Sequence, residues 1–144
     1  MEPRIDVLTL GVSDLERALA FYRDGLGFAT EGIIGTEFPG DDEHPAGAAA
    51  MFELRNGLTL ALYPRSELAK DANVPPAEPS TGGFSIGHFV PTDADVDALL
   101  ARAEAAGATL TDTAHRRPWD LYSGYFRDPD GHLWEVISRP GEGP

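Results

Sequence analysis

The order of hydrophobic and polar residues at the start of the chain predicts a strand followed by a helix. Residues 5–12 alternate between the two kinds and are rich in β-branched side chains, which is typical of a strand. Ser13 and Glu16 then have the spacing of a capping box. Apolar residues follow at helical spacing, at Leu15, Leu19 and Tyr22. Gly27 suits the left-handed backbone that ends a helix, so we expect a helix at about 13–24.

Three further strands are expected in the first half of the chain. Residues 28–34 form one strand, and the apolar run Ala49–Leu54 forms another. Asn56-Gly57 follows, and this dipeptide between two apolar runs is a strong signal for a hairpin turn. Leu58–Tyr63 is then the returning strand, which gives the first half the order β-α-β-β-β.

The same order of elements returns after residue 83. Phe84–Val90 has the pattern of a strand, and a helix at about 93–106 begins with several aspartates, where negative charge favours the helix dipole. Three short strands complete the repeat, at Ala108–Thr111, Ser123–Arg127 and Leu133–Ile137. The last two are joined by Asp128-Pro129-Asp130-Gly131, whose proline and glycine occupy positions that suit a tight turn.

The two halves therefore form a tandem repeat. Gly27 matches Gly107 and Gly57 matches Gly131, at separations of 80 and 74 residues. The prediction is an α+β fold with a first βαβββ module at 1–70, a proline-rich linker at 71–83 and a second βαβββ module at 84–144, all within one integrated domain. The helices would cover one face of each curved mixed sheet, and the opposite faces would enclose a ligand cup.

Composition and charge narrow the class of function. The 144 residues have a net charge of −13 and include no cysteine, which excludes disulfides and thiolate chemistry. Such an acidic surface repels phosphates, so no nucleic-acid partner is expected. Without a long apolar run, no membrane partner is expected either, and we expect a cytoplasmic protein. Two interpretations of this negative charge are open: it keeps the protein soluble, or it attracts a cationic small molecule.

Two stretches resemble a known superfamily. LGVSDLERALAFY at residues 10–22, followed by Leu26-Gly27-Phe28, and YFRDPDGHLWEV at residues 125–136 are similar to the opening and the close of modules in the glyoxalase/bleomycin-resistance/dioxygenase (vicinal-oxygen-chelate) superfamily. The resemblance spans nearly the whole chain and implies the paired-module fold. It leaves function open, because the superfamily includes isomerases, lyases, dioxygenases, antibiotic-modifying enzymes and antibiotic binders.

The resemblance also implies where a metal would be held. Metal enzymes of the superfamily take His or Glu ligands from the first and last strand of each module. Matching by motif, those positions are Val7, Ala61, Ser85 and Glu135 in this chain. One carboxylate and one hydroxyl do not make a firm site for Zn²⁺, Ni²⁺ or Fe²⁺, which need three or four His or carboxylate donors. We therefore expect no metal and no cofactor.

The remaining candidate residues are one carboxylate and a set of aromatic side chains. Glu135 is expected to face the cup, where it would pair with a cationic ligand, act as a base, or brace the structure through an Arg or a Tyr hydroxyl. Aromatic walls for a flat or cationic ligand would come from Phe38, Tyr63, Trp119, Tyr122 and Tyr125, for each of which ordinary core packing is the alternative.

The four histidines do not predict a catalytic group. Alternation places His88 under the second helix, in the core or at its rim, and turns His132 away from Glu135. His44 follows Asp41-Asp42-Glu43 and is expected to be solvated. His115-Arg116-Arg117 would either flank the cup and hold an anion or form a solvated turn.

Three hypotheses follow for function. The first is a binding protein that sequesters an aromatic or cationic small molecule without a catalytic metal. The second is a glyoxalase-type lyase or isomerase that uses Glu135, with or without a metal. The third is a housekeeping member with no separable ligand. A homodimer is also expected, because superfamily members commonly dimerise and open sheets leave edges to cover.

Overall fold

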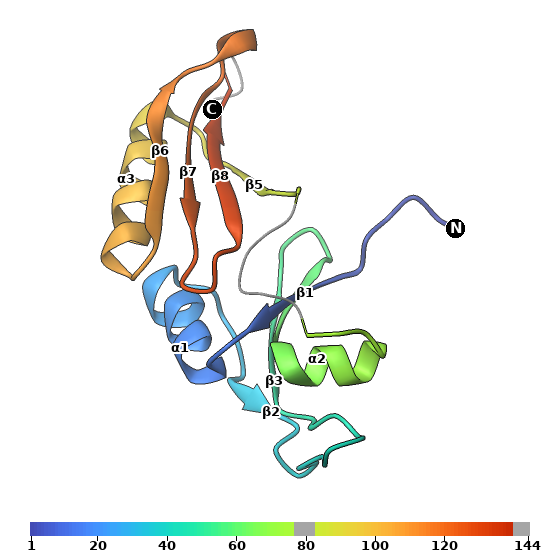
Figure 1. Cartoon of the computed structure of the whole chain (residues 1–144). Coiled ribbons are helices and arrows are strands. Elements are labelled where there is room, and N and C mark those ends of the chain that lie inside the picture. The colour runs from blue at the N-terminus through green and yellow to red at the C-terminus, as the bar shows by residue number, and fades with distance from the viewer. Residues whose placement is uncertain (77–82, 140–144) are drawn as a thin grey trace. The chain divides into compact units, whose positions relative to one another are not determined.

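The structure is a computed structural model that describes residues 1–76 and 83–139 (Figure 1). The chain divides into two compact units, Met1–Pro79 and Ser80–Pro144. Within the described residues, no helix combines the length and the hydrophobicity needed to cross a membrane.

The first unit contains one four-stranded sheet with the order β1-β4-β3-β2. Strand β1 runs parallel to β4, and the other pairs are antiparallel. A π-helical turn at Phe21–Gly25 extends α1. The elements are β1 (Val7–Val12), α1 (Leu15–Ala20), β2 (Ile33–Ile34), β3 (Ala49–Glu53), β4 (Thr59–Pro64) and α2 (Arg65–Ala72).

The second unit repeats this topology, with the sheet order β5-β8-β7-β6 and a parallel pair of β5 with β8. Its elements are β5 (Ile86–Phe89), α3 (Asp93–Ala105), β6 (Thr109–Arg116), a short 3-10 turn (Pro118–Asp120), β7 (Tyr122–Arg127) and β8 (Leu133–Ser138). The α+β class and the two βαβββ modules with mixed sheets are thereby confirmed. Each sheet is open, and the predicted cup stays a prediction.

An aromatic cluster forms the core of the first unit. The rings of Tyr22, Phe28 and Phe52 have centroids 5.8–6.0 Å apart. Tyr22 and Phe52 are both fully buried. Gly27 has φ 82°, as expected for the residue that ends the helical segment. The start of α1 differs from the prediction, because Asp14 and not Ser13 caps it by accepting a hydrogen bond from Arg17 N.

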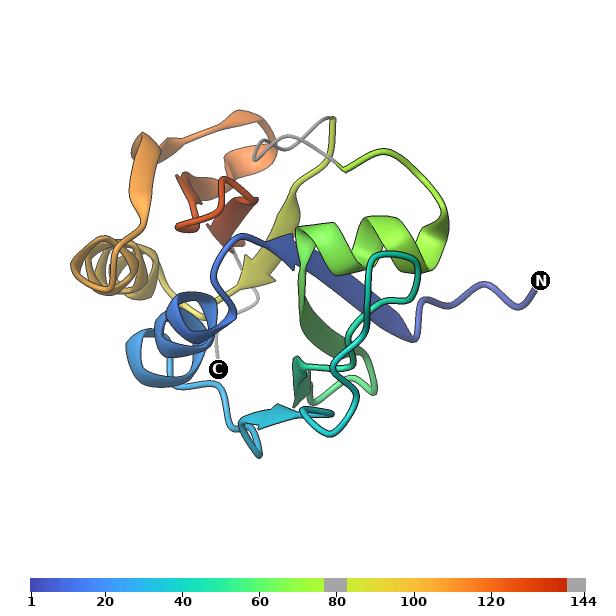
Figure 2. The ribbon, with the colours of Figure 1, turned by 60° about the horizontal axis from the view of Figure 1, so that its bottom comes forward.

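Helix α2 was not predicted, and it covers part of the sheet face opposite α1. A Cβ atom on Gly11 would lie 2.7 Å from Arg65 Cγ, which places the helix against β1 (Figures 1 and 2). Asn73 ends α2 in the left-handed conformation. The first two residues of the predicted linker at 71–83 therefore lie in a helix, and residues 77–82 fall outside the described part of the chain.

In the second unit, α3 covers one face of the sheet (Figure 1). A capping box between Thr92 and Asp95 begins the helix. The helix buries Val96, Leu100 and Ala103, and the sheet buries Phe126, Trp134 and Val136. Phe126 and Trp134 stack with an interplanar angle of 3°. This packing assigns one face of the second sheet to the core, and no helix among the described residues of the second unit covers the other face.

Candidate functional site

The candidate site lies on the face of the second sheet opposite α3, which we call the open face. Two contacts show which side chains of β7 point toward α3. Tyr122 donates a hydrogen bond to Asp97 of α3, and a Cβ on Gly124 would contact Leu100 of α3. Side chains alternate along a strand. The open face therefore carries Ser123, Tyr125 and Arg127 from β7, and Leu133 and Glu135 from β8.

Glu135 is held by two hydroxyl groups on this face. Ser123 Oγ donates to Glu135 Oε2 at 2.8 Å, and the Tyr125 hydroxyl also donates to the Glu135 side chain. Tyr125 and Glu135 are register partners across β7 and β8. Glu135 is only partly buried, so its carboxylate combines a fixed orientation with access to solvent.

Arg117 determines which way the Ser123 hydroxyl points. Its Nε donates to Ser123 Oγ at 2.5 Å, and its Nη2 donates to the Ser123 carbonyl at 3.1 Å. Because a guanidinium can only donate, Ser123 Oγ accepts this bond and directs its own proton to Glu135. The Arg117 Cζ also lies 5.2 Å from the centroid of the Tyr125 ring. Arg117 therefore positions both groups that bond Glu135.

Tyr125 remains a hydrogen-bond donor at neutral pH. Burial raises the pKa of its hydroxyl above the ordinary value of 10.0, and the hydrogen bond and charge of Glu135 raise it further. The positive charge of Arg117 opposes this shift only in part. A protonated Tyr125 beside a carboxylate gives the site one donor and one acceptor at adjacent positions.

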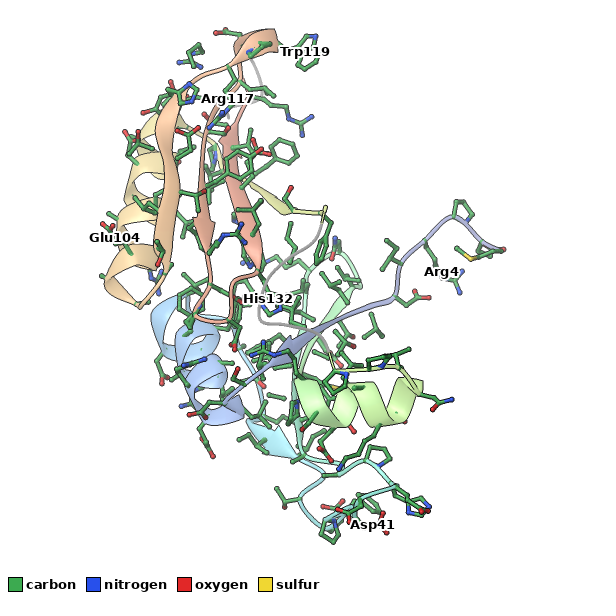
Figure 3. The ribbon with its side chains drawn as sticks, viewed as in Figure 1. Arg4, Asp41, Glu104, Arg117, Trp119 and His132 are labelled. Atoms are coloured by element: carbon green, nitrogen blue, oxygen red, sulfur yellow. The ribbon has the colours of Figure 1, made fainter. Side chains whose placement is uncertain are left out.

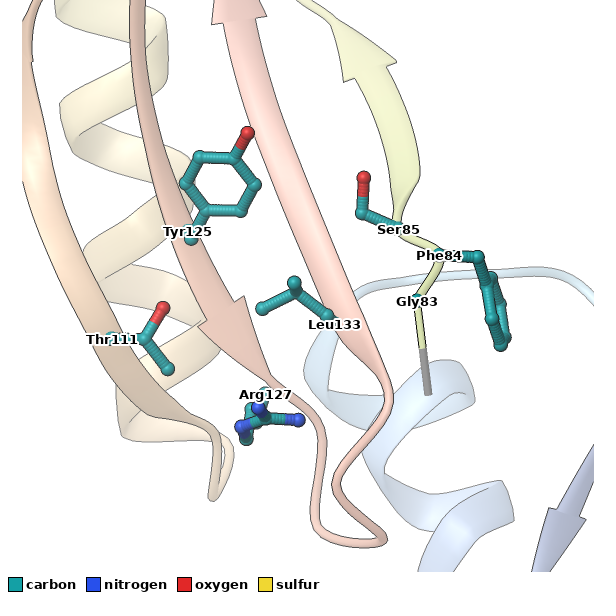
Figure 4. Close-up of a pocket in the computed structure, with 7 residues that line it drawn as sticks. All are labelled: Gly83, Phe84, Ser85, Thr111, Tyr125, Arg127 and Leu133. Carbon is teal, nitrogen blue, oxygen red and sulfur yellow. The ribbon is translucent and has the colours of Figure 1, made fainter. Parts of the chain in front are cut away.

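A hollow of about 610 Å³ opens beside this network (Figure 4). Tyr125 connects the two, because it lines the hollow and also bonds Glu135. Leu133 contributes apolar surface, Ser85 contributes a hydroxyl group from the chain before β5, and Thr111 contributes one from β6. The lining is completed by Phe84, Arg127 and backbone at Gly83. The arrangement suits a small organic molecule with polar groups.

The structure does not bring all predicted aromatic residues of the second unit to this face. Tyr122 faces α3, because it precedes Tyr125 by three positions and so points to the opposite side of the sheet. Trp119 projects from the connection between β6 and β7 and is 88% exposed (Figure 3). Its φ of 61° and the φ of 58° at Asp120 are unusual for residues other than glycine.

Phe38 and Tyr63 belong to the first unit. The Tyr63 hydroxyl donates to the carbonyl of Ala46 at 2.5 Å, and burial raises its pKa. Glu67 of α2 accepts from the N–H of the same Ala46 at 2.8 Å. Tyr63 thus helps to fasten the loop before β3, and Phe38 in that loop is 62% exposed. Their predicted role in ligand binding stays a prediction.

The residues at the four superfamily metal positions do not fit a transition-metal site. Val7 and Ala61 carry no donor atom, Ser85 has one weakly basic hydroxyl, and Glu135 is the single carboxylate. Nor do three or more His, Asp or Glu side chains converge elsewhere in residues 1–76 and 83–139. This chemistry of the donor set gives no basis for a step through a metal.

The histidines lie apart from Glu135 in most cases. His88 pairs with Val136 and remains exposed, which places it at the rim of the core, where partial burial lowers its pKa. His132 bonds Asp128 within the turn at 2.8 Å. His44 is solvated beside Asp41, as expected.

His115, Arg116 and Arg117 do not form a purely solvated turn. The His115 ring lies beside the carboxylate of Asp112, with Nε2 at 3.0 Å from Oδ2. Arg117 Nη2 donates to that same oxygen at 2.8 Å, while Arg116 pairs with Asp93 at the start of α3. The segment therefore divides its cations between the two faces of the sheet.

Asp112 should contribute to stability in a pH-dependent way. Its pKa is lowered from 3.8, first by the hydrogen bond from Arg117 and then by that from His115. A carboxyl whose pKa is lower in the folded state stabilises the fold above its unfolded pKa and loses this contribution as the pH falls through the folded value. Urea unfolding should show Asp112→Asn less stable than the wild type at pH 7. The difference should shrink below about pH 3.8, whereas a difference independent of pH would contradict the ionic role.

Sequence reasoning missed three residues of the site, Ser123, Arg127 and Asp112, and it left the role of Arg117 open. Alternation from Tyr125 would have placed Ser123 and Arg127 on its face, so a signal for these two was present. No periodicity reaches Arg117, which lies between β6 and the 3-10 turn. Asp112 follows a register shift in β6, and such a bulge breaks the alternation.

The paired modules and the polar open face define a class of small two-module α+β proteins. A sequence model of the Glyoxalase/Bleomycin resistance protein/Dioxygenase superfamily matches residues 4–136. The chain belongs to this superfamily, which confirms the resemblance drawn from its opening and closing motifs.

Solved structures that are similar to this chain carry names from the same superfamily. A glyoxalase-related enzyme from Fulvimarina pelagi is 28% identical with a TM-score of 0.79, and the match covers 99% of this chain and 96% of that one. A lactoylglutathione lyase from Agrobacterium tumefaciens is also 28% identical, with a TM-score of 0.66 and coverage of 96% and 95%. A superfamily member from Nocardioides is 25% identical, with a TM-score of 0.72 and coverage of 100% and 89%.

Proposed function

We propose that the protein binds an aromatic or cationic small molecule on the open face of the second sheet, without a catalytic metal. The observation that carries this proposal is the hollow of about 610 Å³ lined by Tyr125, which is bonded to the partly exposed Glu135. The ring gives a flat surface for an aromatic body, and the carboxylate gives a partner for an amine. Such binding matches the resistance proteins that the superfamily name includes.

The overall charge supports a cationic ligand. A net charge of −13 raises the local concentration of cations around the protein, and this attraction acts before any specific contact forms. The donor set described above supports binding without a metal. The homodimer and the cytoplasmic location expected from the sequence stay predictions.

The test compares benzylamine with its neutral analogue benzyl alcohol, each measured by the rise in melting temperature and by calorimetry. Glu135→Gln keeps an oxygen that can accept from Ser123 and Tyr125 but removes the charge. We expect it to weaken benzylamine binding by about 1–3 kcal/mol and to leave benzyl alcohol nearly unchanged.

Glu104→Gln is the matched control, because Glu104 is an exposed residue of α3 and so lies on the other side of the sheet (Figure 3). It removes the same charge from the same unit and should change neither affinity. Equal weakening of benzylamine in both variants would show that only the net charge matters. An unchanged affinity in Glu135→Gln would remove the pairing role of Glu135.

A second candidate is a glyoxalase-type lyase or isomerase in which Glu135 acts as the base. The similarity to the lactoylglutathione lyase of Agrobacterium tumefaciens favours it, as does the contact of Glu135 with a protonated Tyr125. The two candidates are separated by the turnover of lactoylglutathione, assayed with and without added Zn²⁺ or Ni²⁺. Turnover that disappears in Glu135→Gln would support the enzyme, and its absence in the wild type would support the binding protein.

A further inference from the structure

The hollow on the open face contains a charge that the proposed function does not use. Among the described residues that line it, Arg127 is the only charged one. This is notable in a protein with 24 acidic residues and 11 Lys and Arg. A local cation in an acidic protein opposes the long-range field, so a cationic ligand group would avoid this end of the hollow.

The Arg127 guanidinium is held in a defined place. Its Nη1 donates to the carbonyl of Gly131 at 2.7 Å, which ties it to the turn between β7 and β8. Arg127 is partly buried, and its register partner across the sheet is Leu133. Figure 4 shows Arg127 at the end of the hollow below Tyr125 and Leu133. A guanidinium fixed beside apolar surface loses less conformational freedom on binding than a side chain in open solvent.

Resting on the proposed function, we propose that the ligand also carries a carboxylate, which binds at Arg127. A guanidinium presents paired N–H groups that match the two oxygens of a carboxylate. Ser85 and Thr111 line the same hollow with hydroxyl groups that can donate to the same anion. Leu133 and the Tyr125 ring would contact the apolar body that bears the carboxylate.

The spacing of the two charged residues defines the ligand class further. Tyr125 is the register partner of Glu135, and Arg127 follows Tyr125 on the same face. Two residues along a strand span about 7 Å, so Arg127 is anchored about 7 Å along β7 from Tyr125, whereas Glu135 is anchored level with Tyr125 on β8. The ligand class is therefore an aromatic zwitterion, with a carboxylate toward Arg127 and an amino group toward Glu135.

Four probes that share a benzene ring and differ in their charged groups test this inference: benzyl alcohol, benzylamine, benzoate and 4-(aminomethyl)benzoate. Calorimetry with the wild type should give the highest affinity for 4-(aminomethyl)benzoate. Arg127→Gln should weaken both carboxylates by about tenfold or more and leave benzyl alcohol and benzylamine unchanged. Arg102→Gln is the matched control, because it removes the same charge from α3 on the other side of the sheet.

The outcomes separate the inference from the proposed function. If Arg127→Gln binds both carboxylates as the wild type does, the inference is overturned, while binding of benzylamine would leave the proposed function standing. If none of the four probes binds at millimolar concentration, both are overturned. If Arg127→Gln does not fold, Arg127→Lys replaces it. A selective loss for the two carboxylates then supports the inference, and an equal loss or no loss for all four overturns it.

Discussion

Replacing Phe52 with alanine should lower the free energy of unfolding of the first unit by about 3–5 kcal/mol. Phe52 is fully buried and its ring contacts those of Tyr22 and Phe28, with an edge-on geometry to Phe28. The substitution removes a large apolar side chain from water-free surroundings and leaves a cavity that its rigid neighbours cannot fill. Urea unfolding followed by circular dichroism measures the change.

Phe38→Ala is the control for this prediction, because it is the same substitution at a side chain that is 62% exposed. It should change the free energy of unfolding by no more than about 0.5 kcal/mol. Similar losses for the two variants would mean that the aromatic cluster of Tyr22, Phe28 and Phe52 is not the core of the first unit.

Gly124→Val should destabilise the second unit, although valine favours strands and glycine does not. A Cβ at this position would lie 2.5 Å from Leu100 Cδ1 and 3.0 Å from both Ala114 N and Asp112 O. The two backbone atoms cannot move without disturbing β6, and Leu100 is buried in α3. Overpacking of this kind costs about 1–3 kcal/mol, and a branched side chain should reach the upper end.

Gly87→Val is the matched control in the same sheet. A Cβ on Gly87 would meet only Ile137 Cδ1, at the ordinary contact distance of 3.7 Å. Strand propensity should therefore decide this case, with a free energy of unfolding equal to that of the wild type or higher. If Gly124→Val also proves stabilising, then α3 does not pack against β7 as closely as the structure has it.

The regular part of the fold could be predicted because its signals are local. Gly57 and Gly131 have φ values of 85° and 93° in the two hairpin turns. Glycine adopts such positive φ values readily, which is why a glycine at these positions signals a turn in the sequence. The strands before and after these turns lie within one or two residues of their predicted positions. Alternation also indicated which way Glu135 faces, and in the structure it shares that face with Leu133.

The irregular parts could not be predicted in the same way. Only Ile33 and Ile34 form a strand within the predicted segment 28–34, because pairing with β3 extends over just two residues. Strand β6 continues to Arg116, five residues beyond its expected end, through two register shifts that conceal the alternation. Helix α2 is short and mostly polar, with Leu68 as its one large apolar residue, and its packing against Gly11 is a tertiary contact.

The carboxylate of the candidate site, Glu135, could be predicted from the sequence, whereas most of the residues around it could not. Glu135 was identified from a motif on a regular strand, and bracing by an Arg or a Tyr hydroxyl was one of the expected alternatives. The structure has both features, since Tyr125 bonds Glu135 directly and Arg117 acts through Ser123. Tyr122 was grouped with Tyr125 by closeness in the sequence, and their separation of three residues puts them on opposite faces.

The most direct test of binding on the open face is a titration of isotope-labelled protein with 4-(aminomethyl)benzoate, followed by amide chemical shifts. We expect saturable changes at Ser85, Thr111 and residues 123–127 and 133–135, with little change along the outer side of α3. Changes confined to α3 or to the first unit, or no change at millimolar ligand, would contradict binding at the open face.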